Sequence, residues 1–142
     1  PHPPFWIGGS GEQVTLRLVA RWGDACNVGG DPETLRHKFA VLQRHCDDLR
    51  RDYDEIVRST NAMVHLLAPG EDAERATAPF RRGQTLDEYA SYFTLGTADQ
   101  IVEHLQSLVD AGANYLVVYL AGTAYDQSLV RRFAEEVMPN VG

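Results

Sequence analysis

The sequence predicts an α/β fold in which parallel strands alternate with helices. Four short apolar segments suit strands, and each is followed by a segment with helical spacing of its apolar residues; they are 5–7, 24–28, 59–66 and 115–120. The last of them, YLVVYL, is apolar on both faces, which is typical of a strand in a parallel sheet that helices cover. Four βα units are half of the eight in a closed barrel. Two architectures are therefore compatible with the sequence: a (βα)4 half of a TIM barrel and an open four-stranded sheet.

The first unit begins with a short strand and a glycine-rich turn. Residues 5–7 are bulky and apolar, so we expect a buried strand there. Gly8, Gly9 and Gly11 follow it, and they allow a sharp turn whose bare backbone can lie against a ligand. A strand that passes through such a turn into a helix presents N–H groups at the positive end of the helix dipole, where phosphate binds. We therefore expect a phosphate-binding turn; a tight turn without a ligand is the alternative.

The helix after this turn has a start signal of its own. Ser10 and Gln13 fit an S-x-x-Q capping box, which predicts a helix over residues 12–22 with Ser10 as its N-cap. The dinucleotide-binding fingerprint fits poorly, because Val14 stands where its third glycine belongs. The candidate residues for binding a cofactor phosphate are therefore those of the turn, Gly8, Gly9, Ser10, Gly11 and Glu12.

The second unit adds one candidate and the clearest helix. Asn27 ends the second strand at the edge where ligands gather in barrels, so its amide is a candidate cofactor or substrate contact, with turn initiation as the alternative. Asp31 as N-cap and Pro32 at the first helical position predict the start of a helix that runs to Leu49. Its apolar residues lie at spacings of four and three and form one stripe: Leu35, Phe39, Leu42, Cys46 and Leu49.

The remainder of the chain supplies the last two units. A strand over 59–66 is followed by short helices near 72–77 and 86–93. A T-x-x-Q capping box at 97–100 opens a helix that ends at Gly112, and a final helix starts near Asp126.

Composition limits the class of protein. The chain has 142 residues, 44% of them hydrophobic and 23% charged, which fits one globular domain over residues 1–142. Its net charge of −7 without a basic stripe argues against nucleic acid and anionic membranes as partners. Cys26 and Cys46 are expected as buried thiols in a reducing cytoplasm. Because the chain begins with Pro1 instead of methionine, we expect a processed chain or a piece of a longer one.

Other reactive side chains receive plainer interpretations. His65 lies in the third strand, and we expect a hydrogen-bonded core histidine in preference to a ligand contact. The chain has no histidine or cysteine pair at metal-ligand spacing, so we expect no metal site. Arg81 and Arg82 are expected in a solvated loop, with a phosphate or an acidic cofactor tail as the alternative partner.

Three motifs, in this order and spacing, carry a family resemblance. They are residues 4–12 (PFWIGGSGE), residues 16–28 (LRLVARWGDACNV), and the pair 95–102 (LGTADQIV) and 110–118 (DAGANYLVV). They resemble the C-terminal half of the bacterial luciferase-like monooxygenases, and most of all the branch that uses the deazaflavin coenzyme F-420. The resemblance covers essentially the whole chain. Nothing in the chain resembles the family's N-terminal half, which carries the residues around the ring of the cofactor and much of the substrate pocket.

The resemblance implies a TIM barrel of which this chain supplies strands five to eight, with the cofactor phosphate on the turn from Gly8 to Glu12. It implies an F-420- or FMN-dependent oxidoreductase or monooxygenase, acting on a small-molecule substrate, that this chain alone does not complete. Half a barrel leaves open sheet edges and an uncovered apolar interior, so we expect a homo-oligomer or pairing with a separate N-terminal half-barrel. The alternatives are a non-catalytic phosphate- or nucleotide-binding α/β module and an inactive truncated remnant. The sequence leaves the catalytic residues unknown.

Overall fold

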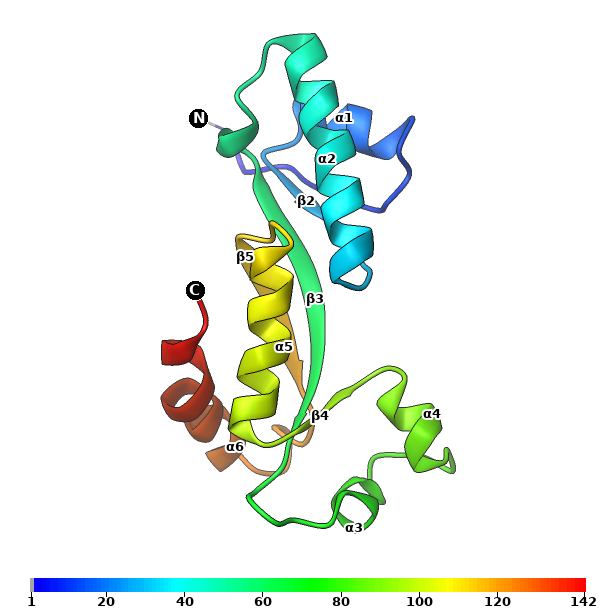
Figure 1. Ribbon diagram of the computed structural model, residues 1–142, viewed down its shortest axis with the longest axis vertical. Helices are drawn as coiled ribbons and strands as arrows, with labels where there is room; N and C mark the ends of the chain where they lie inside the picture. The colour runs from blue at the N-terminus through cyan, green and yellow to red at the C-terminus, as the bar shows by residue number, and fades with distance from the viewer. Residues whose placement is uncertain (1) are drawn as a thin grey trace. The chain divides into compact units, whose positions relative to one another are not determined.

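The computed structural model describes residues 2–142 and confirms an α/β fold with parallel strands and intervening helices (Figure 1). The strands are β1 (Trp6–Gly8), β2 (Ala25–Asn27), β3 (Val57–Leu66), β4 (Thr94–Gly96) and β5 (Tyr115–Leu120). The α-helices are α1 (Thr15–Trp22), α2 (Pro32–Leu49), α3 (Ala73–Thr77), α4 (Leu86–Ala90), α5 (Ala98–Asp110) and α6 (Ser128–Arg132). Short turns of other helix types are η1 (Tyr53–Glu55), η2 (Phe133–Val137) and η3 (Met138–Asn140).

Backbone contacts divide the chain into two compact units, and β3, α5 and β5 each contribute residues to both. The first unit runs to Asn61 and includes Ser107–Val117; the second comprises Ala62–Gln106 and Val118–Gly142. The prediction of a single domain over residues 1–142 stays a prediction.

The strands are joined in the order β1-β2-β3-β4, and β5 also pairs with β3. In the first unit, Gly8 of β1, Asn27 of β2 and Ser59 of β3 are partners in two parallel ladders, so these three residues lie side by side. In the second unit the last residues of β3 pair in parallel with β4, with His65 opposite Leu95. Parallel ladders place the carboxyl ends of neighbouring strands at one edge.

The core of the first unit lies between its strands and two helices. Figure 1 shows α1 and α2 beside β2. Both helices bury one face, as their amphipathic sequences predict. The fully buried side chains of α1, α2 and β2 include Leu16, Val19, Ala20, Cys26, Leu35, Leu42 and Cys46.

A strand forms close to residues 5–7, as expected, but the expectation that its side chains are buried was wrong. Phe5 is 59% exposed and Trp6 is 47% exposed. β1 is also an edge strand, because it pairs only with β2. The Trp6 ring meets the Tyr115 ring edge-on at 5.2 Å, and Tyr115 is itself half exposed. The two rings therefore form an exposed aromatic pair on the first unit.

The second unit contains a strand that the sequence did not predict. β4 has only three residues and is therefore too short to show a period, but it brings the strands to five where four were expected. The connection before it carries α3 and α4, as predicted, and α5 follows with Ile101 and Leu105 buried. The capping box that opens α5 is present in part, because Gln100 Oε1 accepts a hydrogen bond from Thr97 N at 3.0 Å. Among residues 2–142, no helix combines the length and the apolar character that crossing a membrane requires.

Thr60 in β3 is a buried hydroxyl without a hydrogen-bond partner among residues 2–142. Replacing it with valine, which has nearly the same shape, is expected to raise the free energy of unfolding by about 1 kcal/mol, because an unsatisfied buried polar group costs roughly 1–3 kcal/mol. Urea unfolding followed by tryptophan fluorescence measures the change.

The neighbouring Ser59→Ala is the matched control for Thr60→Val. Ser59 Oγ donates to Cys26 O at 2.7 Å and accepts from Asn27 Nδ2 at 3.0 Å, so its removal is expected to lower stability by about 1–2 kcal/mol. A Thr60→Val protein that is less stable than the wild type would contradict the assignment of Thr60 as an orphaned group.

Candidate functional site: the glycine turn after β1

The turn between β1 and α1 is longer than the sequence indicated. α1 begins at Thr15, its N-cap position is Val14, and no side chain caps it. The predicted capping box from Ser10 to Gln13 was therefore wrong: Ser10 lies in the exposed turn. The backbone bends at Gly9, whose φ of +126° is a conformation that only glycine adopts easily. The Gly9 N–H donates to Asn27 O at 3.0 Å, and this bond fixes the start of the turn on β2.

Beyond Gly9 the turn presents backbone donors. The N–H groups of Ser10, Gly11 and Glu12 have no hydrogen-bond acceptor within the described chain. Thr15 packs beneath them: a Cβ on Gly11 would lie 3.0 Å from Thr15 Oγ1, and one on Gly9 would lie 3.3 Å from Thr15 Cγ2. Glycine at these two positions therefore lets the turn pack closely on Thr15. A phosphate group accepts hydrogen bonds from consecutive free N–H groups of this kind.

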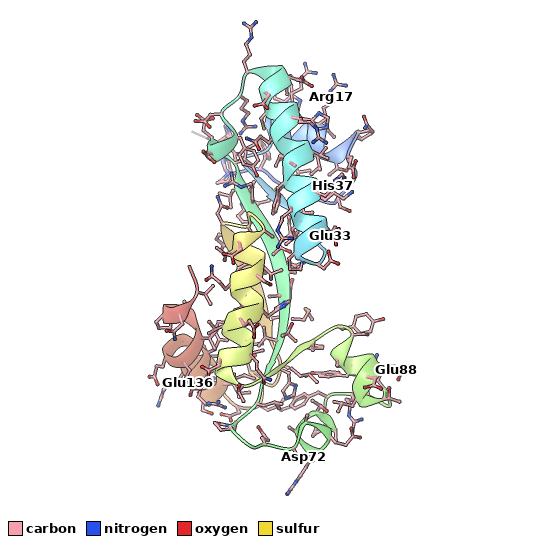
Figure 2. All side chains as sticks on the ribbon, in the orientation of Figure 1. Arg17, Glu33, His37, Asp72, Glu88 and Glu136 are labelled. Carbon is pink, nitrogen blue, oxygen red and sulfur yellow. The ribbon has the colours of Figure 1, made fainter. Side chains whose placement is uncertain are left out.

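The carboxylate of Glu12 is directed to helix α2. Lys38 Nζ lies 2.6 Å from Glu12 Oε1 and His37 Nε2 lies 2.9 Å from the same oxygen. His45 Nε2 lies 2.8 Å from the backbone oxygen of Glu12. The hydrogen bonds from Lys38, and then from His37, hold the pKa of the Glu12 carboxyl below its usual range. The carboxylate of Glu12 is thus paired with the ammonium group of Lys38, and α2 anchors the turn. Figure 2 labels His37 and Glu33 along α2.

Lys38→Met is expected to raise the pKa of Glu12 toward its ordinary value near 4.5, because the largest cause of the lowering is removed. Since the folded-state pKa is below the unfolded one, this pair stabilises the fold above the unfolded pKa, and the contribution is lost as the pH falls through the folded pKa. The measurement is a carbon NMR titration of the Glu12 carboxyl. His37→Gln is the control and should shift the pKa less; an unchanged pKa in Lys38→Met would show that Lys38 does not hold the turn.

Asn27 lies beside the turn and belongs to a polar cluster at the carboxyl end of β2. Its Nδ2 donates to Ser59 Oγ at 3.0 Å and to Asn61 Oδ1 at 3.1 Å. In this arrangement Asn27 Oδ1 and Asn61 Nδ2 have no partner within residues 2–142. The structure therefore brings Asn27 together with the glycine turn, as the ladder partner of Gly8, and leaves one acceptor and one donor available.

Other candidate groups of the sequence lie elsewhere. Cys26 is buried, and burial raises its pKa to about 11, so its thiol stays protonated at neutral pH and acts as a small apolar residue. His65 is a buried histidine whose Nδ1 lies 3.1 Å from Tyr89 Oη, as expected of a partnered core residue. Within residues 2–142, no three histidine, cysteine, aspartate or glutamate side chains are grouped so as to hold a metal ion.

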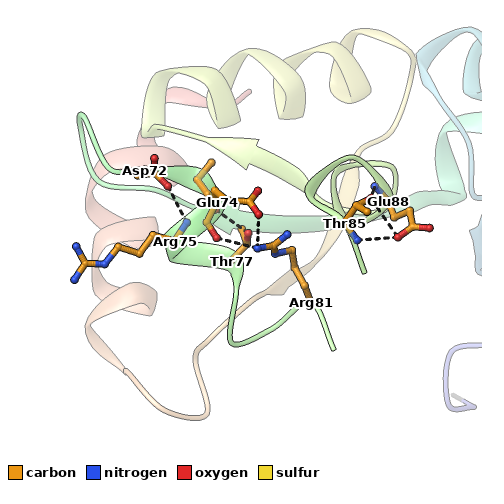
Figure 3. A network of polar contacts seen from close by, with 8 residues as sticks. Asp72, Glu74, Arg75, Thr77, Arg81, Thr85 and Glu88 are labelled. Carbon is orange, nitrogen blue, oxygen red and sulfur yellow. Dashed lines mark hydrogen bonds and ion pairs between the residues drawn. The ribbon is translucent and has the colours of Figure 1, made fainter. Parts of the chain in front are cut away.

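Of the arginine pair, Arg81 is held by Glu74. Its guanidinium lies 2.8 Å from Glu74 Oε1 and 3.1 Å from the Glu74 backbone oxygen, as Figure 3 shows. Arg82 is exposed and has no hydrogen bond or ion pair with residues 2–142. The two neighbours therefore differ: Arg81 is structural, whereas Arg82 is available to a ligand.

Comparison with known proteins gives no match to a family model and none to a curated protein. Solved structures do match, at probability 1.00. A coenzyme F-420-dependent tetrahydromethanopterin reductase from Methanopyrus kandleri is 16% identical, with a TM-score of 0.68 over 98% of this chain and 51% of the other. An F-420-dependent secondary alcohol dehydrogenase, solved with an F-420–acetone adduct, is 15% identical, with a TM-score of 0.72 over 100% of this chain and 50% of the other.

The chain has the fold of about half of a luciferase-like TIM barrel. A third luciferase-like structure is the oxygenating constituent of 3,6-diketocamphane monooxygenase from Pseudomonas putida, in complex with FMN. It is 15% identical, with a TM-score of 0.71 over 99% of this chain and 49% of the other. This chain thus spans about half the length of the luciferase-like structures it matches, and at these identities the likeness concerns the fold.

Several residues around the turn were not found from the sequence. Lys38 and His45 come from a helix that begins 20 residues after Glu12, and no local pattern links them to the turn. Ser59 and Asn61 had a signal: they are two polar residues at alternate positions of β3, so they share a face of the sheet. That spacing could have placed them beside Asn27.

Proposed function

We propose that this chain supplies the cofactor-phosphate-binding part of a flavin- or deazaflavin-dependent oxidoreductase barrel, with the turn from Gly8 to Glu12 as the phosphate site. The observation that carries the proposal is the set of N–H groups of Ser10, Gly11 and Glu12, which have no acceptor within the described chain. They lie after the carboxyl end of a parallel strand, the edge at which ligands bind in barrels. The ion pair of Glu12 with Lys38 removes the charge that would oppose an anion.

The residues fit a phosphate-bearing cofactor in a second respect. Asn27 Oδ1 and Asn61 Nδ2 offer one acceptor and one donor next to the turn, and these suit the polar groups of a cofactor's side chain or ring. FMN or F-420, when bound, supplies hydride-transfer chemistry. The residues of this chain would bind and orient the cofactor, and we assign no general acid or base among them.

The test is a fluorescence titration of the purified chain with FMN, F-420, riboflavin and NAD. We expect FMN or F-420 to bind, and FMN to bind at least about tenfold more tightly than riboflavin, since only FMN carries a phosphate. Equal affinity for FMN and riboflavin would overturn the phosphate site. A preference for NAD would favour a nucleotide-binding module, and binding of none of the four would favour an inactive remnant.

We further propose that the chain works in an assembly, with a second copy or with a separate chain that carries the other half of a barrel. The exposed Trp6–Tyr115 pair and the unpaired outer side of β1 support association, because exposed aromatic surface and free strand edges favour it. The two buried cysteines, both free thiols, suit a cytoplasmic location. Sedimentation tests the assembly: a stable, well-folded monomer at micromolar concentration would contradict it.

A further inference from the structure

A cavity lies in the second unit, at the carboxyl ends of β3 and β5. The Ala121 N–H that follows β5 donates to Val64 O of β3 at 2.8 Å, and the cavity opens beside Ala121 and Gly122. Its volume is about 360 Å³, within the range of small-molecule sites. Its other walls come from the connection between β3 and β4: three aromatic rings, Phe80, Tyr89 and Phe93, and two polar side chains, Arg82 and Gln84.

The aromatic walls are fixed in place. Tyr89 and Phe93 stack with ring centroids 4.4 Å apart and planes 7° from parallel. Phe80 meets the His65 ring edge-on at 5.3 Å, and His65 Nδ1 lies 3.1 Å from Tyr89 Oη. Burial lowers the pKa of His65, so this imidazole is neutral at pH 7 and adds no charge behind the rings. The cavity therefore has preformed aromatic walls, in which Phe80 and Phe93 are partly exposed and Tyr89 is buried against Phe93.

The backbone that carries these walls is also held. Thr85 and Glu88 form a complete capping box at the start of α4, the helix that carries Tyr89. Arg81 is bound by Glu74, and Thr77 Oγ1 donates to Ala73 O at 2.7 Å. Figure 3 shows these contacts in the connection between β3 and β4. The side chains of the cavity thus project from an ordered connection.

Arg82 is the charged group of the cavity. It has a φ of +50°, an uncommon conformation for a residue other than glycine, and its guanidinium has no partner within residues 2–142. Its neighbour Arg81, by contrast, donates from Nη2 to the carboxylate and the backbone oxygen of Glu74. An unpaired guanidinium next to flat aromatic walls is complementary to a planar anion, because it binds carboxylates with two parallel hydrogen bonds.

We propose that this cavity binds a planar aromatic carboxylate, with its ring against Phe80 and Phe93 and its carboxylate on Arg82. All residues that carry this inference belong to the second unit. The proposal therefore stands independently of the phosphate site on the first unit.

The test is NMR titration of the chain with 2-naphthoate and with its uncharged analogue 2-naphthylmethanol. We expect 2-naphthoate to bind more tightly and to shift the resonances of Phe80 and Phe93. Arg82→Gln should lower the affinity for 2-naphthoate about tenfold and leave the affinity for 2-naphthylmethanol unchanged. Arg82→Lys should retain part of the preference for 2-naphthoate over 2-naphthylmethanol. Arg75→Gln is the matched control: it removes the same charge from the same connection, outside the cavity walls, and should leave both affinities within twofold.

Three results would overturn the proposal. They are absence of binding of both probes, equal affinity for the two, and an affinity for 2-naphthoate that Arg82→Gln does not change. Failure of FMN to bind leaves these outcomes unaffected, since the titration uses no cofactor.

Discussion

Replacing Leu42 with alanine is expected to lower the free energy of unfolding by about 2–5 kcal/mol, because a fully buried leucine leaves a cavity as well as losing its transfer energy. Leu42 lies on α2 and has no exposed surface. Trp6 and Trp22 are the only two tryptophans of the chain and belong to the same unit, so their fluorescence during urea unfolding reports this loss.

The same helix offers a matched control for Leu42→Ala. Leu49 is the last residue of α2 and is 42% exposed, so Leu49→Ala is expected to cost less than about 1 kcal/mol. If the two variants lose equal stability, α2 does not pack on the rest of the first unit through the face that carries Leu42.

Helix α2 could be predicted from the sequence because the signals that start it are local. The helix begins where predicted because Asp31 Oδ1 accepts a hydrogen bond from Thr34 N at 2.7 Å and Pro32 takes the first helical position. Both signals act within one turn of helix, so they can be found in the sequence. The buried stripe ends at Cys46, one member earlier than predicted. Leu49 is exposed because it is the last residue of the helix and no further turn covers it.

The failures have causes that are distant in sequence. The Ser10 capping pattern is local, but the conformation of Gly9 and its bond to Asn27 determine how long the turn is, and α1 starts only at Thr15. β4 forms because residues 94–96 pair with residues 64–66, and three residues carry no period. The same limit applies to the turn itself: the glycines were evident from the sequence, whereas the anchoring of Glu12 by Lys38 depends on packing of α2.

Gly9→Val is expected to weaken the binding of FMN by about 10- to 100-fold. The φ of Gly9 is +126°, and a valine in such a conformation costs of order 1–3 kcal/mol, which the chain avoids by turning Gly9 and thereby moving the free N–H groups that follow. The steric contact is secondary: a Cβ at Gly9 would lie 3.3 Å from Thr15 Cγ2, which a shift of a few tenths of an ångström relieves. Fluorescence titration with FMN measures the effect, and circular dichroism verifies that the variant is folded.

Two further variants separate the causes in Gly9→Val. Gly29 lies in the turn after β2, has an ordinary φ and has no atom within 4 Å of its added Cβ, so Gly29→Ala should leave the affinity for FMN within about twofold. Adding Thr15→Ser to Gly9→Val removes the crowded methyl group but not the backbone strain, so we expect it to restore little of the binding. FMN binding by Gly9→Val at wild-type affinity would mean that the amides after β1 do not hold the phosphate, because a valine reproduces the turn that presents them only at the cost of backbone strain.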